Sequence, residues 1–430
     1  MMVRRKWICL LVSAVMTLIA LGQFSVLQAQ EKPTLKVWLY RSFVREQNEY
    51  MEEQFRFFEQ ATGIKIKSTF LPSEEIYRKW MASIEAGTFP DVAEIWVQTV
   101  DQFNRMGILM DLSDLYTELN TKSPFGPLLE KMVTMGGKKI VIPLNTAAEA
   151  HYWRKDILEN LGLSVPGTWQ ELKATAKKIT ENTSLYGFGS ALGRPATDGE
   201  KFIQTVLWSH GGSIVNEKEE FVFKSKATLE TVRYIASLVE EEIMPPGVTA
   251  WDDGSNNRAY LTRWVAGVQN SASIYAHMVK NDPALLKNTV ISLIPEGPAG
   301  RFTDVVPHAI GVSKDTKYPE AAKKLIKFIM EPDRYQGWIE HGGGNFQPVY
   351  LDLMKHPFWE DPYRKPFAEM SLKHGVYQGW PGPPSAPRGE IFGTYVLSDM
   401  MQKVILEGFT PEEAIDWAFE EIKEIYARWK

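Results

Sequence analysis

Two strand-helix-strand patterns near the start of the chain constrain its fold more than any other feature. In the first, residues 35–40 alternate like a strand, and residues 51–58 carry apolar side chains at helical spacing. Gly63 ends this helix, and a second strand follows at residues 64–66. A strand, a helix and a strand in this order form a parallel pair with a right-handed crossover. The chain is therefore predicted to build an α/β fold.

The second pattern repeats this order further along the chain. A helix with apolar side chains on one face opens at Ser73 and ends at Gly87, and residues 92–96 form the next strand. With 430 residues, of which 44% are apolar, the chain can bury an ample core. Its length suggests two domains or one large domain.

The N-terminus has the layout of a secretory signal. Basic residues 4–6 precede an apolar run at residues 7–21, and polar residues follow. We expect cleavage after Ala29, which makes residues 1–29 a signal peptide, although residues 20–22 offer an alternative small-x-small site. An uncleaved membrane anchor is the other interpretation, but the apolar run is short for a span of about 20 residues. The mature protein is therefore predicted to be periplasmic or secreted.

Cysteine and charge point to the same kind of exported protein. The only cysteine, Cys9, lies inside the apolar run and would leave with the signal. Small residues do not precede it, so we do not expect a lipoprotein, and the mature chain needs no disulfide. Removal of three basic residues and no acidic ones moves the formal charge from −5 to −8. This negative charge disfavours nucleic acid as a partner.

Enzyme motifs are incomplete in this sequence. Residues 341–344 read HGGG and resemble an oxyanion-hole motif, but no G-x-S-x-G accompanies them. The sequence also has no Walker A loop, no complete dinucleotide loop and no H-E-x-x-H. Its seven histidines are scattered without metal-ligand spacing. We therefore expect a protein that is not an enzyme and has no catalytic residue, metal or cofactor. A secreted carbohydrate-active enzyme is the alternative.

Residues 152–179 carry the clearest local signals, in the sequence YWRKDILENLGLSVPGTWQELKATAKKI. Thr168 and Glu171 form a capping box at the start of a helix, because each side chain can accept a hydrogen bond from an unpaired backbone N–H. Upstream, residues 152–160 are predicted to form a shorter helix that Gly162 stops.

This segment resembles the sugar-binding proteins of bacterial ABC importers, extracellular solute-binding protein family 1, which includes maltose- and multiple-sugar-binding proteins. Further motifs of that family occur elsewhere in the chain, in the family's order, at residues 58–64, 86–92, 103–112, 295–300 and 311–313. The resemblance covers nearly all of the mature chain.

The resemblance implies an architecture beyond what the patterns alone support. It implies two doubly wound α/β domains with a ligand cleft between them, like a type II periplasmic binding protein. The N-terminal lobe would comprise residues 33–143 and 302–344, and the C-terminal lobe residues 144–301 and 345–430.

Aromatic residues near strand ends are candidates for ligand contacts. A sugar presents flat C–H faces and a rim of hydroxyls, so its site needs aromatic platforms and planar polar side chains. Open α/β sheets bind ligands beyond the carboxyl ends of their strands. Trp38 and Arg41 lie at the end of the first strand, and Trp96 and Gln98 at the end of a later one. Each aromatic residue taken alone is more often part of the core than a platform, because Trp and Tyr bury large areas wherever they lie.

Other candidates come from motif position in the family. Asn145 and Glu149 follow the place where the family chain crosses between lobes, and Tyr395 stands at a late aromatic platform. Ala147 occupies the position of a sugar-binding glutamate in maltose-binding members, which argues against maltose as the ligand. The remaining candidates are Trp208, Trp251, Asp252, Ser273, Tyr275, His308, Asn345 and Trp380.

These features predict a protein that captures a mono- or oligosaccharide in an interdomain cleft and delivers it to the membrane permease of an ABC importer. We expect a monomer. A module that feeds a sensor would share every residue discussed. Polyamine, iron and phosphate ligands are open alternatives, but iron would need clustered Tyr and His, and phosphate would need basic support at helix N-termini. Neither pattern is evident, so a neutral sugar is the leading expectation.

Overall fold

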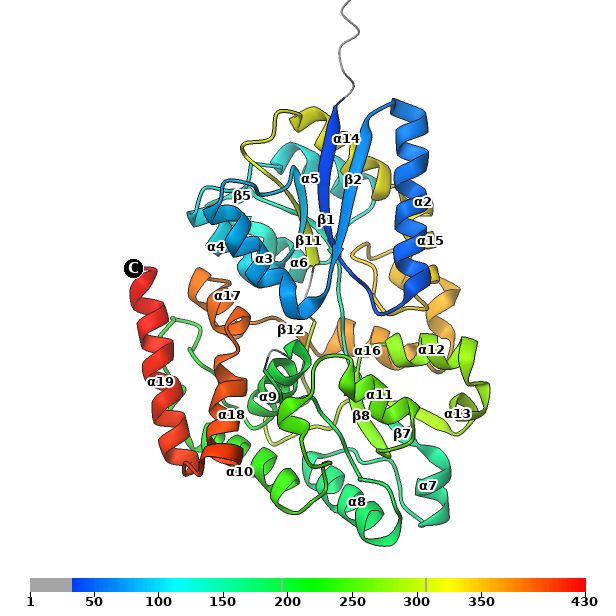
Figure 1. Cartoon of the computed structure of the whole chain (residues 1–430), viewed down its shortest axis with the longest axis vertical. Coiled ribbons are helices and arrows are strands. Elements are labelled where there is room, and N and C mark those ends of the chain that lie inside the picture. The colour runs from blue at the N-terminus through cyan, green and yellow to red at the C-terminus, as the bar shows by residue number, and fades with distance from the viewer. Residues whose placement is uncertain (1–32, 195, 306–307) are drawn as a thin grey trace, which may run out of the picture.

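The computed structural model describes residues 33–194, 196–305 and 308–430. The expected signal peptide and Cys9 lie outside these residues. The described chain forms two lobes, each built on one sheet of three or more strands (Figure 1). No helix in these ranges is both long and apolar enough to cross a membrane.

The first sheet has the strand order β2-β1-β3-β11-β6. Its strands are β1 (Thr34–Tyr40), β2 (Lys65–Leu71), β3 (Val92–Trp96), β6 (Ile142–Asn145) and β11 (His308–Val312). Strand β1 is parallel to β2 and β3, whereas β11 runs antiparallel to β3 and β6. The predicted strand-helix-strand units are confirmed, with α2 (Arg45–Thr62) and α3 (Ser73–Glu85) as the crossover helices.

Glycines end both crossover helices, as predicted. Gly63 caps α2 in the left-handed conformation, with φ of 70°, and its N–H bonds to the carbonyl of Glu59. Gly87 follows α3 with φ of 63°. Only glycine adopts this conformation without a steric penalty, which explains the sharp turn into the next strand.

The second sheet has the order β8-β7-β9, and β7 is antiparallel to both neighbours. Its strands are β7 (Ala150–Arg154), β8 (Gly267–Asn270) and β9 (Thr289–Ser292). The helix predicted at residues 152–160 is wrong in its first part, because only Lys155–Asn160 form a helix, α7. Tyr152 and Trp153 are both fully buried in the central strand. Side chains buried on both faces lack the alternation that identifies a strand in sequence.

The remaining elements surround these sheets. The helices are α4 (Val100–Arg105), α5 (Ser113–Lys122), α6 (Pro127–Val133), α8 (Trp169–Asn182), α9 (Thr197–Ser209), α10 (Lys226–Glu240), α11 (Ser255–Leu261), α12 (Ser273–Asn281), α13 (Pro283–Lys287), α14 (Pro319–Ile329), α15 (Pro332–His341), α16 (Lys365–Lys373), α17 (Ala386–Gly393), α18 (Val396–Glu407) and α19 (Pro411–Arg428). Short 3-10 turns are η1 (Val97–Thr99), η2 (Val248–Ala250), η3 (Leu353–Lys355) and η4 (Pro357–Glu360). Short strand pairs are β4 (Thr134–Met135) with β5 (Lys138–Lys139), and β10 (Thr303–Asp304) with β12 (Gly375–Val376).

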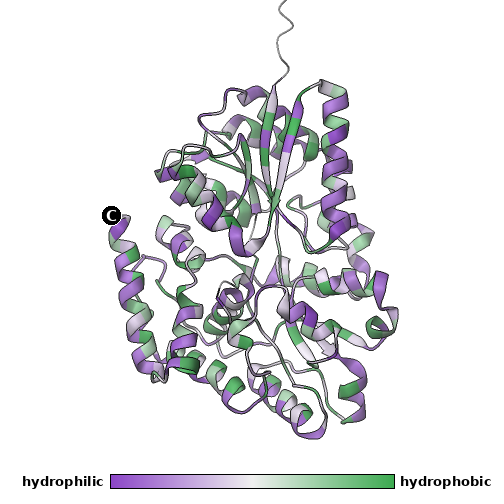
Figure 2. Ribbon diagram, in the orientation of Figure 1, coloured by the Kyte–Doolittle hydropathy of each residue, from purple (hydrophilic) through white to green (hydrophobic). Residues whose placement is uncertain are grey.

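Each lobe has its own hydrophobic core. The first core draws on residues between 35 and 147 and on a second segment between 309 and 359, including Phe346 and Trp359. The second core draws mainly on residues between 148 and 305 and between 391 and 425. The outer helices, such as α2 and α19, alternate hydrophilic and hydrophobic residues along their length (Figure 2). The chain therefore crosses between the two cores more than once.

The capping box at α8 gives the first prediction. The Thr168 hydroxyl accepts the Glu171 N–H at 3.2 Å, and the Glu171 carboxylate accepts the Thr168 N–H at 3.2 Å, which confirms the motif. Thr168→Ala removes one acceptor and should lower the free energy of unfolding by about 1 kcal/mol in urea denaturation. Thr168→Ser keeps the hydroxyl and should stay within about 0.5 kcal/mol of the parent. Equal losses for both variants would contradict this account.

Candidate functional site

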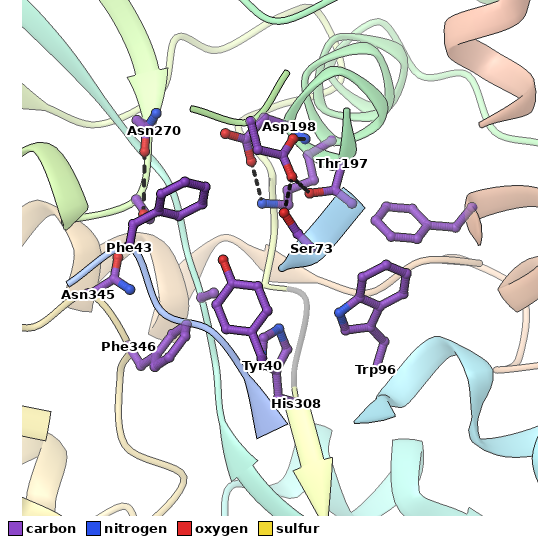
Figure 3. Close-up of a pocket in the computed structure, with 15 residues that line it drawn as sticks. Tyr40, Phe43, Ser73, Trp96, Thr197, Asp198, Asn270, His308, Asn345 and Phe346 are labelled. Carbon is purple, nitrogen blue, oxygen red and sulfur yellow. Dashed lines mark hydrogen bonds and ion pairs between the residues drawn. The ribbon is translucent and has the colours of Figure 1, made fainter. Parts of the chain in front are cut away.

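A cavity of about 40 Å³ lies between the edges of the two lobes (Figure 3). Tyr40 and Trp96, at the carboxyl ends of β1 and β3, line it from the first lobe. His308 lines it from the start of β11, which runs antiparallel and so reaches the same sheet edge. Asp198 and Asn270 line it from the second lobe. This is the place where open α/β sheets bind ligands.

Lys201 forms the centre of a buried ionic network in the second lobe. Its Nζ donates to Glu149 Oε1 at 3.0 Å and to Asp198 Oδ1 at 2.8 Å. The other oxygens of these carboxylates are also occupied, since Gln269 donates to Glu149 Oε2 at 2.7 Å and Asn256 donates to Asp198 Oδ2 at 3.0 Å. Burying a lysine costs free energy unless carboxylates pair with it, and the two carboxylates meet this need.

Asp253 connects this network to the first lobe. Its Oδ2 accepts the hydroxyls of Thr197 and of Ser73, each at 2.6 Å, and Ser73 belongs to α3 of the first lobe. Its Oδ1 accepts the Asp198 N–H at 2.9 Å. Burial raises the pKa of Asp253 to about 6 and the pKa of Glu149 to about 7, since low polarity disfavours the charged form. The two lobes thus share hydrogen bonds directly at the cavity.

A second polar group lies on the first-lobe side. His308 Nδ1 lies 2.6 Å from Glu94 Oε1, and the other carboxylate oxygen accepts the Tyr40 N–H at 2.9 Å. The Tyr40 ring contacts the His308 ring edge-on, with centroids 5.1 Å apart. The Tyr40 hydroxyl points away from His308, toward the Asp198 side of the cavity (Figure 3). These contacts hold the Tyr40 ring at the sheet edge.

Aromatic rings form much of the remaining wall, and amides complete the polar rim. The rings belong to Tyr40, Phe43, Trp96, Phe346 and Phe392. The amide of Asn345 accepts the Ser271 hydroxyl at 2.8 Å and donates to Ser42 at 3.3 Å. Flat apolar faces beside fixed polar groups are the features that a sugar requires.

A larger groove of about 350 Å³ adjoins the cavity, and Phe43 lines both. The groove runs between the start of α2, with Glu46, and α12, with Ser273 and Lys280. Glu46 and Lys280 form an ion pair across it. The cavity and the groove therefore meet at Phe43.

Some sequence-predicted residues gather at this cavity. Trp96, His308 and Asn345 line it. Glu149 holds Lys201, and Ser273 lines the adjoining groove and accepts the hydroxyl of Ser271 at 3.2 Å. Contact with a ligand stays a prediction for each of them.

Other predicted residues lie away from the cavity. The Trp208 ring is fully buried and meets the Trp380 ring edge-on at 6.3 Å. Trp251 is buried and its ring lies 5.5 Å from that of Trp264. Asp252 is exposed and pairs with Arg258 at 2.9 Å, so its neighbour Asp253 is the one in the cavity wall.

The remaining predicted residues do not line the cavity either. Trp38 is half-buried against the first core, and Arg41 is exposed. Tyr275 stacks on Tyr363 and lines a separate surface cavity. Tyr395 is buried at the start of α18 with φ of 62°. Gln98 and Asn145 are buried, and their amides find no hydrogen-bond partner within the described ranges.

Sequence reasoning missed Tyr40, Phe43, Asp198, Lys201 and Asp253 as site residues. Tyr40 ends the first strand, so the rule of strand carboxyl ends could have found it instead of Trp38. The W-x-D pattern at residues 251–253 could have pointed to Asp253 instead of Asp252. The remaining residues sit in segments brought together only by folding, and no motif marks them. Within the described ranges, no group of three or more His, Cys, Asp and Glu side chains could hold a metal ion.

Burial separates the roles of two aromatic residues in the cavity wall. Trp96 is 3% exposed and is enclosed by Tyr77, Trp80 and Phe392. Trp96→Ala should therefore lower the free energy of unfolding by about 3–5 kcal/mol. Phe43 is 49% exposed, so Phe43→Ala should cost only about 0.5 kcal/mol. Urea denaturation of both variants checks this, and a small loss for Trp96→Ala would show that the ring is not core.

The buried Glu149 predicts a pH dependence of stability. Its carboxyl has an ordinary pKa of 4.5, and burial raises this pKa to about 7 in the folded protein. Between these values the folded chain holds a proton that the unfolded chain has released, so stability falls as pH rises from about 4.5 to about 7. Glu149→Gln should flatten this fall, measured as urea stability against pH. An unchanged profile in the variant would contradict the assignment.

Comparisons with known proteins agree with this architecture. The family profile described as bacterial extracellular solute-binding protein matches residues 42–334. A Brucella abortus chain named as a binding protein is 28% identical over 72% of this chain and 75% of its own length. A diacetylchitobiose binding protein of Streptomyces coelicolor is 22% identical over 72% of each chain.

Solved structures share the fold. An ABC transporter solute-binding protein of Thermotoga lettingae, bound with α-D-tagatose, superposes with a TM-score of 0.81 at 23% identity, over 92% of this chain and all of that one. A maltose-bound protein of T. maritima gives a TM-score of 0.80 at 24% identity, over 91% of this chain and 99% of its own. The resemblance drawn from sequence motifs is confirmed. The family profile spans more than half of the chain, and this protein belongs to the bacterial extracellular solute-binding protein family.

Proposed function

We propose that this protein is exported, binds a mono- or oligosaccharide between its lobes without altering it, and delivers it to the membrane permease of an ABC importer. The observation that carries this proposal is the interlobe cavity, where aromatic rings and fixed polar groups meet at the carboxyl edge of the first sheet. Solved proteins with the same fold hold bound sugars, including tagatose, maltose and laminaribiose. These names support a carbohydrate as the ligand class.

The wall chemistry suits a saccharide. Rings of Tyr40, Phe43 and Phe346 offer faces for sugar C–H groups. Asn270 and Asn345 offer amides for the hydroxyl rim. Ala147 also lines the cavity, and its methyl group supplies no hydrogen bond. The ligand therefore differs from that of a relative with a glutamate at this position.

Lobe closure provides the signal that a permease reads. The Ser73 to Asp253 hydrogen bond and the Glu46 to Lys280 ion pair already join the lobes. A ligand that contacts both lobes favours the closed state by its differential affinity for that state. No covalent step is needed, and both oxygens of Asp253 already accept protein donors, which disfavours a role as a free catalytic base.

Export and assembly complete the proposal. The basic residues 4–6 and the apolar run 7–21 support a cleaved signal peptide rather than a lipid anchor. We propose that the mature protein is a monomer that binds no nucleic acid. A sugar-binding module that feeds a sensor is the second candidate, and the docking partner separates the two.

A glycan panel tests the function. At about 100 times its dissociation constant a ligand should stabilise the protein by roughly 2.7 kcal/mol, visible as a higher melting temperature. Product analysis of the same mixtures should show no cleavage. Hydrolysis of a glycan at an enzymatic rate would overturn the proposal in favour of a carbohydrate-active enzyme.

Phe43, which precedes α2, and Phe57, which lies on α2, are two exposed phenylalanines that can be compared to test the site. Phe43→Ala removes a face that borders both cavity and groove, so affinity for the ligand found in the panel should fall about tenfold. Phe57 is 41% exposed on the same lobe and lines neither, so Phe57→Ala should leave affinity unchanged. Titration calorimetry measures both, and equal affinities for the two variants would exclude Phe43 from the site.

A further inference from the structure

We propose that the ligand is a saccharide bearing a protonated amine, whose ammonium group sits between the aromatic wall and the carboxylates of Asp198 and Asp253. This inference rests on the proposed function and names the ligand class for the same cavity. It replaces the neutral sugar expected from sequence.

The charge of the second-lobe wall is unbalanced. Glu149, Asp198 and Asp253 supply three carboxylates. Glu149 and Asp198 both accept from Lys201, and Asp253 accepts the Asp198 N–H. Glu149 and Asp253 are each 2% exposed. Lys201 is the one Lys or Arg among the cavity-lining residues in the described ranges. With the carboxylates ionised, the network therefore has a formal charge of −2.

Neighbouring basic groups do not cancel this charge. Arg258 pairs with Asp252 at the surface. His308 lies against the Glu94 carboxylate, on the first-lobe side of the cavity. His151, which bonds to Gln269, is held neutral because burial lowers its pKa to about 3. The surplus negative charge is left facing the cavity.

A buried surplus charge is costly, and two partners can relieve it. One is a proton, and the raised pKa values of Asp253 and Glu149 reflect that tendency. The other is a cation on the ligand. A sugar hydroxyl can also donate to these oxygens, since a carboxylate oxygen can accept two hydrogen bonds, but a hydroxyl brings no charge to balance the surplus. An ammonium is attracted by the net charge even where the acceptors are shared.

The opposite wall favours a cation as well. Tyr40, Phe43, Trp96 and Phe392 surround the cavity beside the carboxylates. Aromatic faces attract ammonium groups through their quadrupoles, and more strongly where water is excluded. Figure 3 shows the Tyr40 hydroxyl directed toward the Asp198 side, between the rings and the acids.

The dimensions indicate which part of the ligand enters. A volume of about 40 Å³ holds roughly three water molecules at about 10–15 Å³ each, which suits a compact head group. The adjoining groove of about 350 Å³ then takes the rest of the saccharide beyond Phe43. Hydroxyl-bonding amides at Asn270 and Asn345 make a saccharide a better match than a plain polyamine.

Calorimetry on the full mature protein tests this with three β-1,4-linked disaccharides that differ at C2. They are chitobiose with free amines, N,N′-diacetylchitobiose and cellobiose, with spermidine as a fourth probe. We expect the free amine to bind at least tenfold more tightly than either neutral disaccharide. Raising the salt concentration should reduce this preference, because it screens a charge interaction.

Matched variants locate the charge. Asp253→Asn keeps the shape of the side chain and should lower the preference for the amine about tenfold. Asp252→Asn changes the exposed neighbour and should leave the preference unchanged. If Asp253→Asn does not fold, Asp198→Asn should lower the preference for the amine instead. The salt dependence of the parent protein tests the same charge interaction.

Each outcome separates the two proposals. Equal or tighter binding of the neutral disaccharides would overturn the amine inference and leave the sugar-binding function standing. Tight spermidine binding without any sugar would overturn both, and would identify a polyamine-binding protein. Failure of every saccharide in the wider panel would overturn the proposed function itself.

Discussion

The pairing of the Lys201 ammonium, on a side chain only 12% exposed, with the carboxylates of Glu149 and Asp198 is the interaction on which the site depends. A lysine in a low-polarity environment needs carboxylate partners, and here they come from two separate segments. Glu149 follows the strand that leaves the first sheet, and Asp198 lies one helical turn before Lys201 on α9. The ion pairs therefore tie the start of α9 to the segment that crosses between the lobes.

The same network extends to the first lobe through Asp253. The backbone N–H of Asp198 and the hydroxyl of Ser73 both donate to this carboxylate. The Asp253 side chain thus contacts the second lobe through a backbone N–H and the first lobe through Ser73 of α3. Closure of the cleft and the electrostatics of its wall are linked, because separating the lobes would remove a donor from a buried acid.

Family membership explains the fold, but a few side chains at the cavity determine which ligand binds. Solved proteins with this fold hold different bound sugars and are about one-fifth to one-quarter identical to this chain. The sheets and helices position the strand ends, and the side chains there decide what binds. In this chain Ala147 contributes no polar group, while the acids near Lys201 contribute a surplus of negative charge.

Local patterns in the sequence determined much of the fold. The strands β1 and β3, the crossover helices, their glycine ends and the capping box at Thr168 were all predictable, because each depends on residues close together in the chain. The strand β7 was not, because Tyr152 and Trp153 are buried on both faces and lose the alternation of a strand. The predicted Trp96, His308 and Asn345 do line the cavity. Only the tertiary structure brought Tyr40, Lys201 and Asp253 to the same place and buried Trp208 against Trp380, because side-chain contacts between distant segments leave no periodic signal in the sequence.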